Sequence, residues 1–171
     1  HNQRHVLMSC VVPADYPQIY TTHGHNDLGG FLWAFDGNAI LVDAGRASYQ
    51  LSTDVWQQCG PCGHNVLLVE GLSALPETLL SNGRWCPVPY SKARIDLIGR
   101  DDGFVVGHDG FTRIPGVGNH RRSVTLEKDG ILIVDLLDGE ALVAFDTLWH
   151  FAPALALTNE KTLVAEGGAF A

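Results

Sequence analysis

The chain has 171 residues, of which 46% are hydrophobic and 18% are charged, a composition typical of a globular protein rather than a disordered one. Its length predicts a single domain over residues 1–171. The net charge of −8 argues against a nucleic-acid partner, which needs clustered lysine and arginine, and no apolar run reaches the ~20 residues that a membrane span requires.

A hairpin is the first element that the sequence predicts. The apolar segments FLWAF (31–35) and AILVDA (39–44) flank the polar step Asp36-Gly37-Asn38. An Asp-Gly pair readily adopts the positive φ angles of a tight turn, so we expect two antiparallel strands joined at this step. After the hairpin, residues 46–58 are compatible with one short turn or helix.

Next along the chain comes Cys59-Gly60-Pro61-Cys62, with His64 two residues later. A thioredoxin-like dithiol needs a strand-to-helix junction, whereas this motif precedes HNVLLVE (64–70), an apolar run of strand length. A zinc knuckle lacks its second half, because Cys10 and Cys86 stand alone. We therefore favour a local loop or an opportunistic disulfide over both redox chemistry and a zinc knuckle.

The rest of the chain predicts further strands. The segment 72–93 contains three of the eight prolines and no clean alternation, which is typical of a long surface loop. Strand-length segments and Asp-Gly steps then alternate: GFVVGH, RRSVTLEK, ILIVDLL and ALVAFDTLWHF. The pattern indicates an all-β fold, an antiparallel two-sheet sandwich of jelly-roll type with at most one short helix.

A polar segment just before the hairpin is the first candidate site. His23, His25 and Asp27 alternate there, so in an extended segment their side chains face the same side. Two imidazoles on one face suit a metal ligand and a general acid or base, since histidine serves both roles near neutral pH.

Asp43 and His64 are the next candidates. Asp43 ends the apolar run AILVD, where a carboxylate must pair with Arg46, form an Asx turn or ligate a metal. With His25, these two residues would give two imidazoles and a carboxylate, a set that suits zinc. Their wide spacing carries no local signature of its own.

A basic cluster lies later in the chain. Arg121 and Arg122 follow His120, and Arg113 is nearby. A guanidinium group binds carboxylate or sulfate through two parallel hydrogen bonds, so Arg121 and Arg122 are candidates for substrate binding. Charge at the solvated edge of a strand is an equal alternative.

Several blocks of the sequence together resemble one enzyme family. These blocks are HGHNDLGGFLWAFDGNAILVDAGRASY, HNVLLVEG, HDGFTRIPGVGNHRRSVTLEKDGILIVDLLDG and LWHFAP. In this order they are similar to the β-sheet domain of the heparinase II/III-like polysaccharide lyases, over roughly residues 20–153. In those enzymes the β domain lies downstream of an α/α toroid.

The resemblance implies roles for four residues. The second histidine of the family's His-x-His falls on His25, the aspartate of its Leu-Val-Asp-x-Gly block on Asp43, and the histidine of its His-Asn-x-x-Leu block on His64. In the family these three hold a zinc ion that is mainly structural. The first histidine of the pair falls on His23, which in relatives faces the substrate and takes part in proton transfer.

The family reaction is β-elimination at a uronic acid. A base removes the proton at C5, an acid protonates the departing O4, and neutralisation of the carboxylate stabilises the charge that develops. The family's carboxylate-neutralising residues and its principal catalytic tyrosine lie on the toroid, for which this chain has no sequence. Tyr49 and Tyr90 are candidates for cleft tyrosines, although neither matches a catalytic position.

The resemblance also sets expectations about partners and compartment. The first residues, HNQRHVLMSC, show neither an initiator methionine nor a signal peptide, so we expect a fragment of a longer chain that has little lyase activity without its toroid domain. We expect an acidic polysaccharide as substrate, no nucleic-acid or membrane partner, and a periplasmic or secreted location. A homodimer remains an open option, and the sequence does not identify the polysaccharide.

Two other functions stay open at this point. A non-catalytic sugar-binding or scaffolding sandwich would use the same histidine and arginine surface without proton transfer. A cupin-type metalloenzyme also carries His-x-His on a β scaffold, but it normally has a glutamate a few residues later. Here Asn26-Asp27-Leu28-Gly29-Gly30 follows, which ranks the cupin well behind.

Overall fold

The computed structural model describes residues 5–9, 25–48, 52–79, 85–87, 93–153 and 155. The helices and strands of these residues are, in chain order, β1 (His5–Met8), β2 (Leu32–Phe35), β3 (Asn38–Leu41), α1 (Thr53–Cys59), the 3-10 helix η1 (Pro61–Gly63), β4 (Leu67–Val69), β5 (Glu77–Leu79), β6 (Trp85–Pro87), β7 (Ile95–Arg100), β8 (Gly103–His108), β9 (Val117–Leu126), β10 (Ile131–Gly139) and β11 (Phe145–Thr147).

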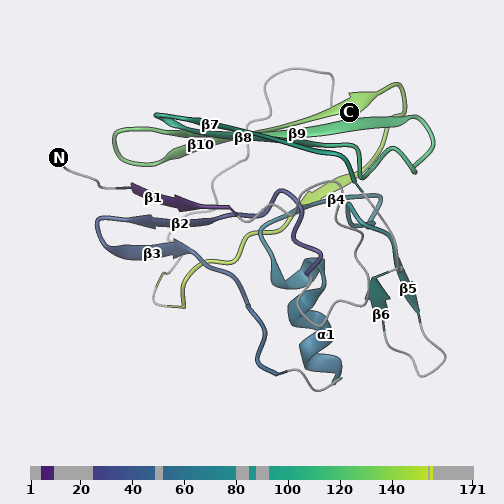
Figure 1. The fold of residues 1–171 in the computed structure, drawn as a ribbon, viewed down its shortest axis with the longest axis horizontal. Helices are drawn as coiled ribbons and strands as arrows, with labels where there is room; N and C mark the ends of the chain where they lie inside the picture. Colours follow the sequence, from purple (N-terminus) through teal and green to yellow (C-terminus); the bar gives the residue numbers. More distant parts are fainter. Residues whose placement is uncertain are drawn as a thin grey trace.

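Two antiparallel sheets face each other and form the body of the fold (Figure 1). One has the strand order β1-β2-β3 and the other has the order β10-β9-β8-β7. Two smaller antiparallel pairs, β11-β4 and β5-β6, complete the strands of the described residues. The predicted all-β antiparallel sandwich with one short helix is confirmed.

One hydrophobic core cluster fills the space between the two sheets. Phe31, Leu41, Phe104, Val106 and Val124 are buried there and form one cluster. Burial of this kind stabilises a fold by ~25 cal/mol for each Å² of apolar surface removed from water. The alternation of β10 fits this arrangement, because successive side chains of a strand point to opposite faces and its residues are partly buried and exposed in turn.

The first hairpin forms as the sequence predicts. β2 pairs antiparallel with β3, and the turn between them has φ angles of 48° at Asp36 and 78° at Gly37. Positive φ at both central residues is the signature of the turn that matches the twist of a β-hairpin. The Asp-Gly steps also fall in turns between β7 and β8 and between β9 and β10, whereas the step at 138–139 lies at an irregularity inside β10.

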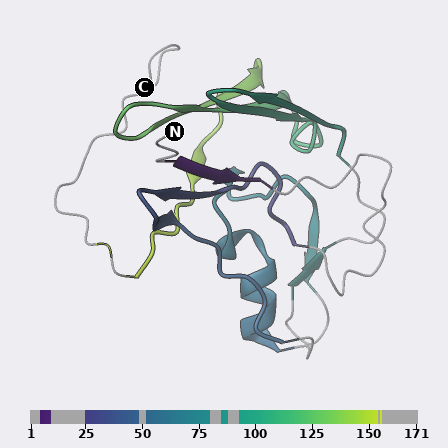
Figure 2. The ribbon, with the colours of Figure 1, turned by 60° about the vertical axis from the view of Figure 1, so that its left-hand side comes forward.

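Helix α1 and the 3-10 helix η1 lie below the β1-β2-β3 sheet (Figure 2). Gly63, the last residue of η1, is buried. A Cβ atom at this position would lie 2.3 Å from the carbonyl oxygen of Gln58, so only glycine allows η1 to pack this closely on the end of α1. The close packing fixes where the chain emerges as His64.

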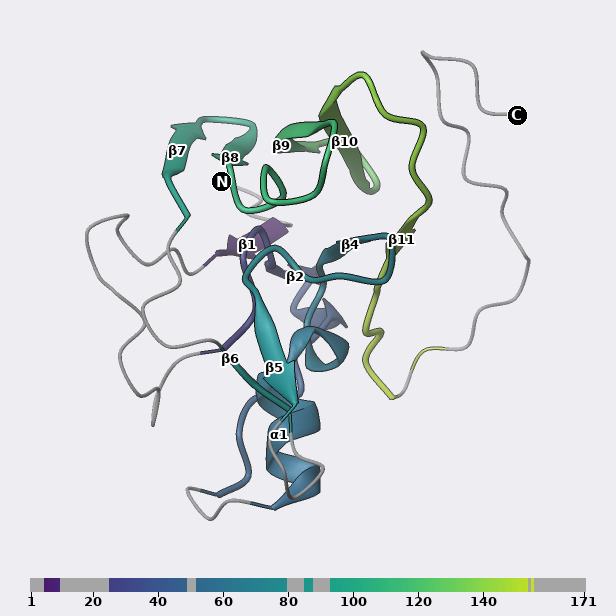
Figure 3. The same cartoon turned by 90° about the vertical axis from the view of Figure 1, so that its right-hand side faces the viewer.

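The segment 72–93 differs from the predicted surface loop. Its described part contains β5 and β6, which pair with each other and lie beside α1 (Figure 3). Ser73, Ala74 and Leu75 are buried. The physical reason is a long-range anchor: the side-chain amide of Asn26 donates hydrogen bonds to Ser73 Oγ at 2.9 Å, to the Leu75 carbonyl at 3.1 Å and to Glu77 Oε1 at 2.8 Å.

In the structure, the predicted strands HNVLLVE and ALVAFDTLWHF are each only three residues long. Only Leu67–Val69 of HNVLLVE is a strand, and it pairs with β11, which is Phe145–Thr147. His64 and Asn65 lie between η1 and this strand, and their side chains bond Asp43 and the Phe31 carbonyl. None of the helices among the described residues is long and apolar enough to cross a membrane.

Candidate metal centre

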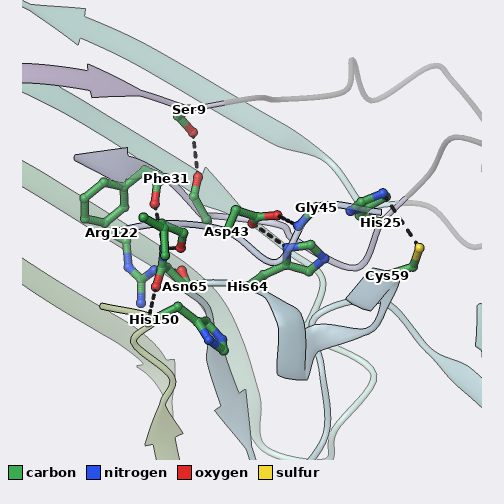
Figure 4. A network of polar contacts seen from close by, with 12 residues as sticks. Ser9, His25, Phe31, Asp43, Gly45, Cys59, His64, Asn65, Arg122 and His150 are labelled. Atoms are coloured by element: carbon green, nitrogen blue, oxygen red, sulfur yellow. Dashed lines mark hydrogen bonds and ion pairs between the residues drawn. The ribbon is translucent and has the colours of Figure 1, made fainter. Parts of the chain in front are cut away.

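His25, Asp43 and His64 lie together in the structure (Figure 4). His25 lies before β2, Asp43 follows β3 and His64 follows η1. One nitrogen or oxygen atom from each lies within 4.8 Å of the corresponding atoms of the other two. The imidazole rings of His25 and His64 have centroids 5.0 Å apart. The fold thus brings together three residues that are far apart in sequence.

Asp43 is held in place by two hydrogen bonds. Its Oδ2 accepts from Nδ1 of His64 at 2.6 Å, and its Oδ1 accepts from the backbone N–H of Gly45 at 2.8 Å. The second bond is the Asx turn that the sequence left as one alternative. Burial alone would raise the pKa of the carboxyl, but the hydrogen bonds from His64 and Gly45 outweigh it and lower the pKa.

His64 is fully buried and has one nitrogen without a partner. Its Nδ1 bonds Asp43, whereas its buried Nε2 has no hydrogen-bond partner among the described residues. Burial lowers the pKa of the ring, but the hydrogen bond to Asp43 and the negative charges nearby outweigh it and raise the pKa. A buried nitrogen without a partner is costly, and a cation at this position would satisfy it.

His25 lies between the other two ligand candidates and helix α1. Its Nε2 is 3.8 Å from the thiol of Cys59, the last residue of α1, and the next backbone N–H, that of Asn26, donates to the Cys59 carbonyl at 2.8 Å. Burial, followed by the nearby charge of His64, lowers the pKa of His25. The ring is therefore biased toward the neutral form that binds a metal.

The two cysteines of the Cys-Gly-Pro-Cys motif are free thiols. Cys59 ends α1 and is buried, whereas Cys62 lies in η1 and is exposed. The motif follows a helix instead of preceding one, so it lacks the strand-to-helix junction of a redox dithiol. Cys59 and Cys62 form no disulfide with each other. The short 3-10 helix η1 agrees with the other alternative, a local loop.

Arg122 does not lie on a solvated face. Its side chain is 0% exposed and its Nε and Nη2 bond the two carboxylate oxygens of Asp135 at 2.7 and 2.9 Å. Its Nη1 donates to the carbonyls of Gly29 at 3.1 Å and Asn65 at 2.7 Å. These contacts leave the guanidinium no access to a ligand at the surface. Both predictions for Arg122, substrate binding and a place at the solvated edge of a strand, are therefore wrong.

Arg121 points the other way. It is the neighbour of Arg122 on β9, and it is exposed, as the alternation of a strand requires. Arg113 donates to the backbone carbonyls of Ser73, Ala74 and Gly110. Arg113 and Arg121 are both exposed, but the guanidinium of Arg113 is occupied by these carbonyls, so Arg121 is the better candidate for substrate binding. His23, Tyr49 and Tyr90 lie outside the described residues.

Asp135, the partner of Arg122, belongs to a network of polar side chains that the sequence analysis did not predict. Nε2 of His120 lies 2.8 Å from Asp135 Oδ1, and Nδ1 of His120 lies 2.9 Å from Nε2 of His108. The backbone N–H of Gly110 donates to Nδ1 of His108 at 3.3 Å. These donors and acceptors are consistent if both imidazoles are neutral and each donates from Nε2.

Comparison with known proteins assigns the family. A model of the heparinase II/III-like C-terminal domain matches residues 2–169, which is nearly the whole chain. The chain therefore belongs to the heparinase II/III-like family of polysaccharide lyases, and it corresponds to the C-terminal domain of that family. No curated protein matches the chain significantly.

Proposed function

We propose that this chain is the β domain of a polysaccharide lyase that cleaves a uronic-acid-containing polysaccharide by β-elimination. Membership of the family supports the reaction class. The observation that carries the site is the convergence of His25, Asp43 and His64 within 4.8 Å. We further propose that an α/α toroid domain precedes this domain in the complete enzyme and supplies the rest of the cleft.

The donor set fits zinc. Two imidazoles and one carboxylate are ligands that zinc accepts in a four-coordinate site. The buried Nε2 atom of His64, which has no hydrogen-bond partner among the described residues, is available to bind a cation. In the structure, Nδ1 of His64 donates a hydrogen bond to Oδ2 of Asp43, and the two atoms are 2.6 Å apart. A cation at Nε2 of His64 would leave this hydrogen bond from Nδ1 in place, so Asp43 would orient the ring while it also offers an oxygen to the cation.

Zinc bound by this group would fix the segment that carries His23. His23 lies two residues before His25, so a ligand bond to His25 restrains the backbone next to it. We propose that His23 exchanges a proton with the substrate, either at C5 or at the departing O4, because imidazole acts as a base when neutral and as an acid when protonated, and both forms are accessible near neutral pH. Arg121 is the exposed cation that would bind a carboxylate of the polymer.

The experiment compares His23→Ala with the unmodified protein, each joined to the toroid domain. Eliminative cleavage forms an unsaturated uronate whose absorbance at ~230–235 nm reports turnover. General acid–base catalysis contributes typically ~10²–10⁴-fold, so we expect a loss of that size with retained polysaccharide binding. Unchanged turnover would contradict the role of His23, and binding without any turnover in the unmodified protein would instead favour the sugar-binding sandwich.

The domain alone provides a second test. We expect this chain without a toroid domain to bind zinc but to show no eliminative cleavage. Zinc content of the purified chain, measured against a His25→Ala/His64→Ala variant, checks the metal. Cleavage by the isolated domain would show that the toroid residues are not needed for the reaction.

A further inference from the structure

We infer that Asn65 is the positioning residue of the candidate metal centre, since it ties together the backbone next to Asp43 and His64. This inference rests on the proposed zinc site. Asn65 is 1% exposed and directly follows His64, but none of its atoms belongs to the His25–Asp43–His64 group. Its carboxamide instead faces three backbone segments (Figure 4).

Both amide hydrogens of Asn65 are used by the segments that carry other ligand candidates. Nδ2 donates to the carbonyl of Val42 at 2.8 Å, and Val42 is the residue before Asp43. Nδ2 also donates to the carbonyl of Phe31 at 2.9 Å, where the segment that begins at His25 enters β2. One side chain therefore fixes the backbone beside Asp43 and beside His64, and holds the end of the segment that carries His25.

The side-chain and backbone oxygens of Asn65 accept hydrogen bonds from two other parts of the chain. Oδ1 accepts from the backbone N–H of His150 at 2.7 Å, and the carbonyl of His150 accepts in turn from the N–H of Val42 at 2.9 Å. The backbone carbonyl of Asn65 accepts from Nη1 of Arg122 at 2.7 Å. Since Arg122 is bound to Asp135 on β10, Asn65 is connected to the opposite sheet.

Among the standard side chains only glutamine has the same carboxamide, and its chain is one methylene longer. Aspartate has the same shape but loses both donors, and its charge would face the carbonyls of Phe31 and Val42. Residues that orient metal ligands typically change metal affinity by ~10–100-fold when they are replaced. A residue that only stabilises the fold changes the free energy of unfolding without this selective effect on the metal.

The test measures zinc affinity by competition with a chromophoric chelator, the visible absorption spectrum of the Co²⁺-loaded protein, and the thermal midpoint of the metal-free chain. Unmodified chain, Asn65→Asp, Asn65→Ser and Val124→Ala are compared. Val124 is a matched control because it is also fully buried, lies in the core between the sheets and has an apolar side chain that takes no part in the hydrogen bonds of Asn65.

We expect Asn65→Asp and Asn65→Ser to weaken zinc binding by ~10–100-fold and to alter the Co²⁺ spectrum, which reports ligand geometry. Val124→Ala should lower the thermal midpoint and leave the zinc affinity and the spectrum unchanged. Variants of Asn65 that bind zinc normally with an unchanged spectrum would overturn the inference. It would also be overturned if Val124→Ala weakened zinc equally, or if neither Asn65 variant folded, because Asn65 would then serve the fold alone.

Failure of the proposed zinc site has a different signature. In that case the unmodified chain itself binds neither zinc nor Co²⁺ with measurable affinity, and the variants at Asn65 do not enter the comparison. If the unmodified chain binds both metals, the proposed site holds and the Asn65 variants decide the inference by themselves.

Discussion

Asp43 and His64 are separated by 21 residues in the sequence and joined by a hydrogen bond of 2.6 Å. Asp43 has 30% of its side chain exposed, whereas His64 has 1%, so the pair reaches from solvent into the interior. The same carboxylate that holds the ring also offers an oxygen to a cation. We propose two roles for Asp43, as a metal ligand and as the partner that orients His64. Loss of each role is expected to lower the zinc affinity by a different amount.

Asp43→Asn separates these roles. Asparagine keeps an oxygen that can accept from His64 Nδ1 but carries no negative charge and is a poor zinc ligand. If Asp43 is a ligand, as we propose, zinc affinity falls by more than ~100-fold, because loss of an orienting partner alone costs ~10–100-fold. Competition titration at pH 7 measures the loss, and a fall of less than ~10-fold would contradict the role of Asp43 as a ligand.

A comparison of cysteine and histidine variants decides whether the Cys-Gly-Pro-Cys motif takes part in the site. Burial raises the pKa of the Cys59 thiol, so it is a thiol and not a metal-binding thiolate at neutral pH. We expect the double variant Cys59→Ser/Cys62→Ser to retain zinc within ~10-fold, and His64→Ala to lose more than ~100-fold. Metal content after gel filtration is the measurement. Retention by His64→Ala together with loss from the double variant would instead indicate a cysteine zinc site.

The sequence predicts part of this structure for physical reasons that apply locally. The hairpin at 31–44 follows from apolar segments on either side of Asp36-Gly37, where both residues adopt positive φ. The alternation of residues 131–137 likewise predicts a strand with one buried face. These features depend on neighbours in the chain, so a single sequence contains the information.

The contacts of the buried polar side chains cannot be predicted from the local sequence pattern. Arg121 and Arg122 are adjacent and chemically alike, and only the register of β9 places one in solvent and the other against Asp135. A shift of one residue would exchange them. Asn65 bonds segments 23 and 34 residues away, so its neighbours along the chain carry no signal for its role beyond its place after His64.

The buried pair of Arg122 and Asp135 gives a prediction about stability. Asp135→Asn removes the charge that the fully buried guanidinium faces. Removal of one partner of a buried ion pair costs ~3–5 kcal/mol, so we expect a decrease of this size in the free energy of unfolding. Urea unfolding at pH 7 measures it. Arg121→Ala, on the exposed face of the same strand, is the control and should change stability by less than ~0.5 kcal/mol; equal effects of the two variants would contradict the burial of Arg122.

His108 gives a prediction about pH. Burial, with the nearby groups His120 and Arg122, lowers the pKa of His108 to about 3 in spite of the opposing charge of Asp135. The unfolded chain, with a pKa of ~6.5 at this residue, therefore binds a proton that the folded chain excludes. Stability must fall as the pH decreases from ~6.5 toward 3, and the single-site relation gives a loss of ~2 kcal/mol between pH 7 and pH 5.

The variant that tests this is His108→Gln, whose side-chain amide can still donate toward His120 but does not titrate. Urea unfolding of both proteins at pH 7 and pH 5 gives the change in stability for each. We expect the variant to be less stable at pH 7, because the acceptor for the Gly110 N–H is lost, but to lose ~2 kcal/mol less than the unmodified chain on acidification. Asp135 does not account for this difference, since its pKa is lowered to about 2 and its contribution is lost only below pH ~4. Equal acid sensitivity of the two proteins would show that His108 accepts a proton in the folded state.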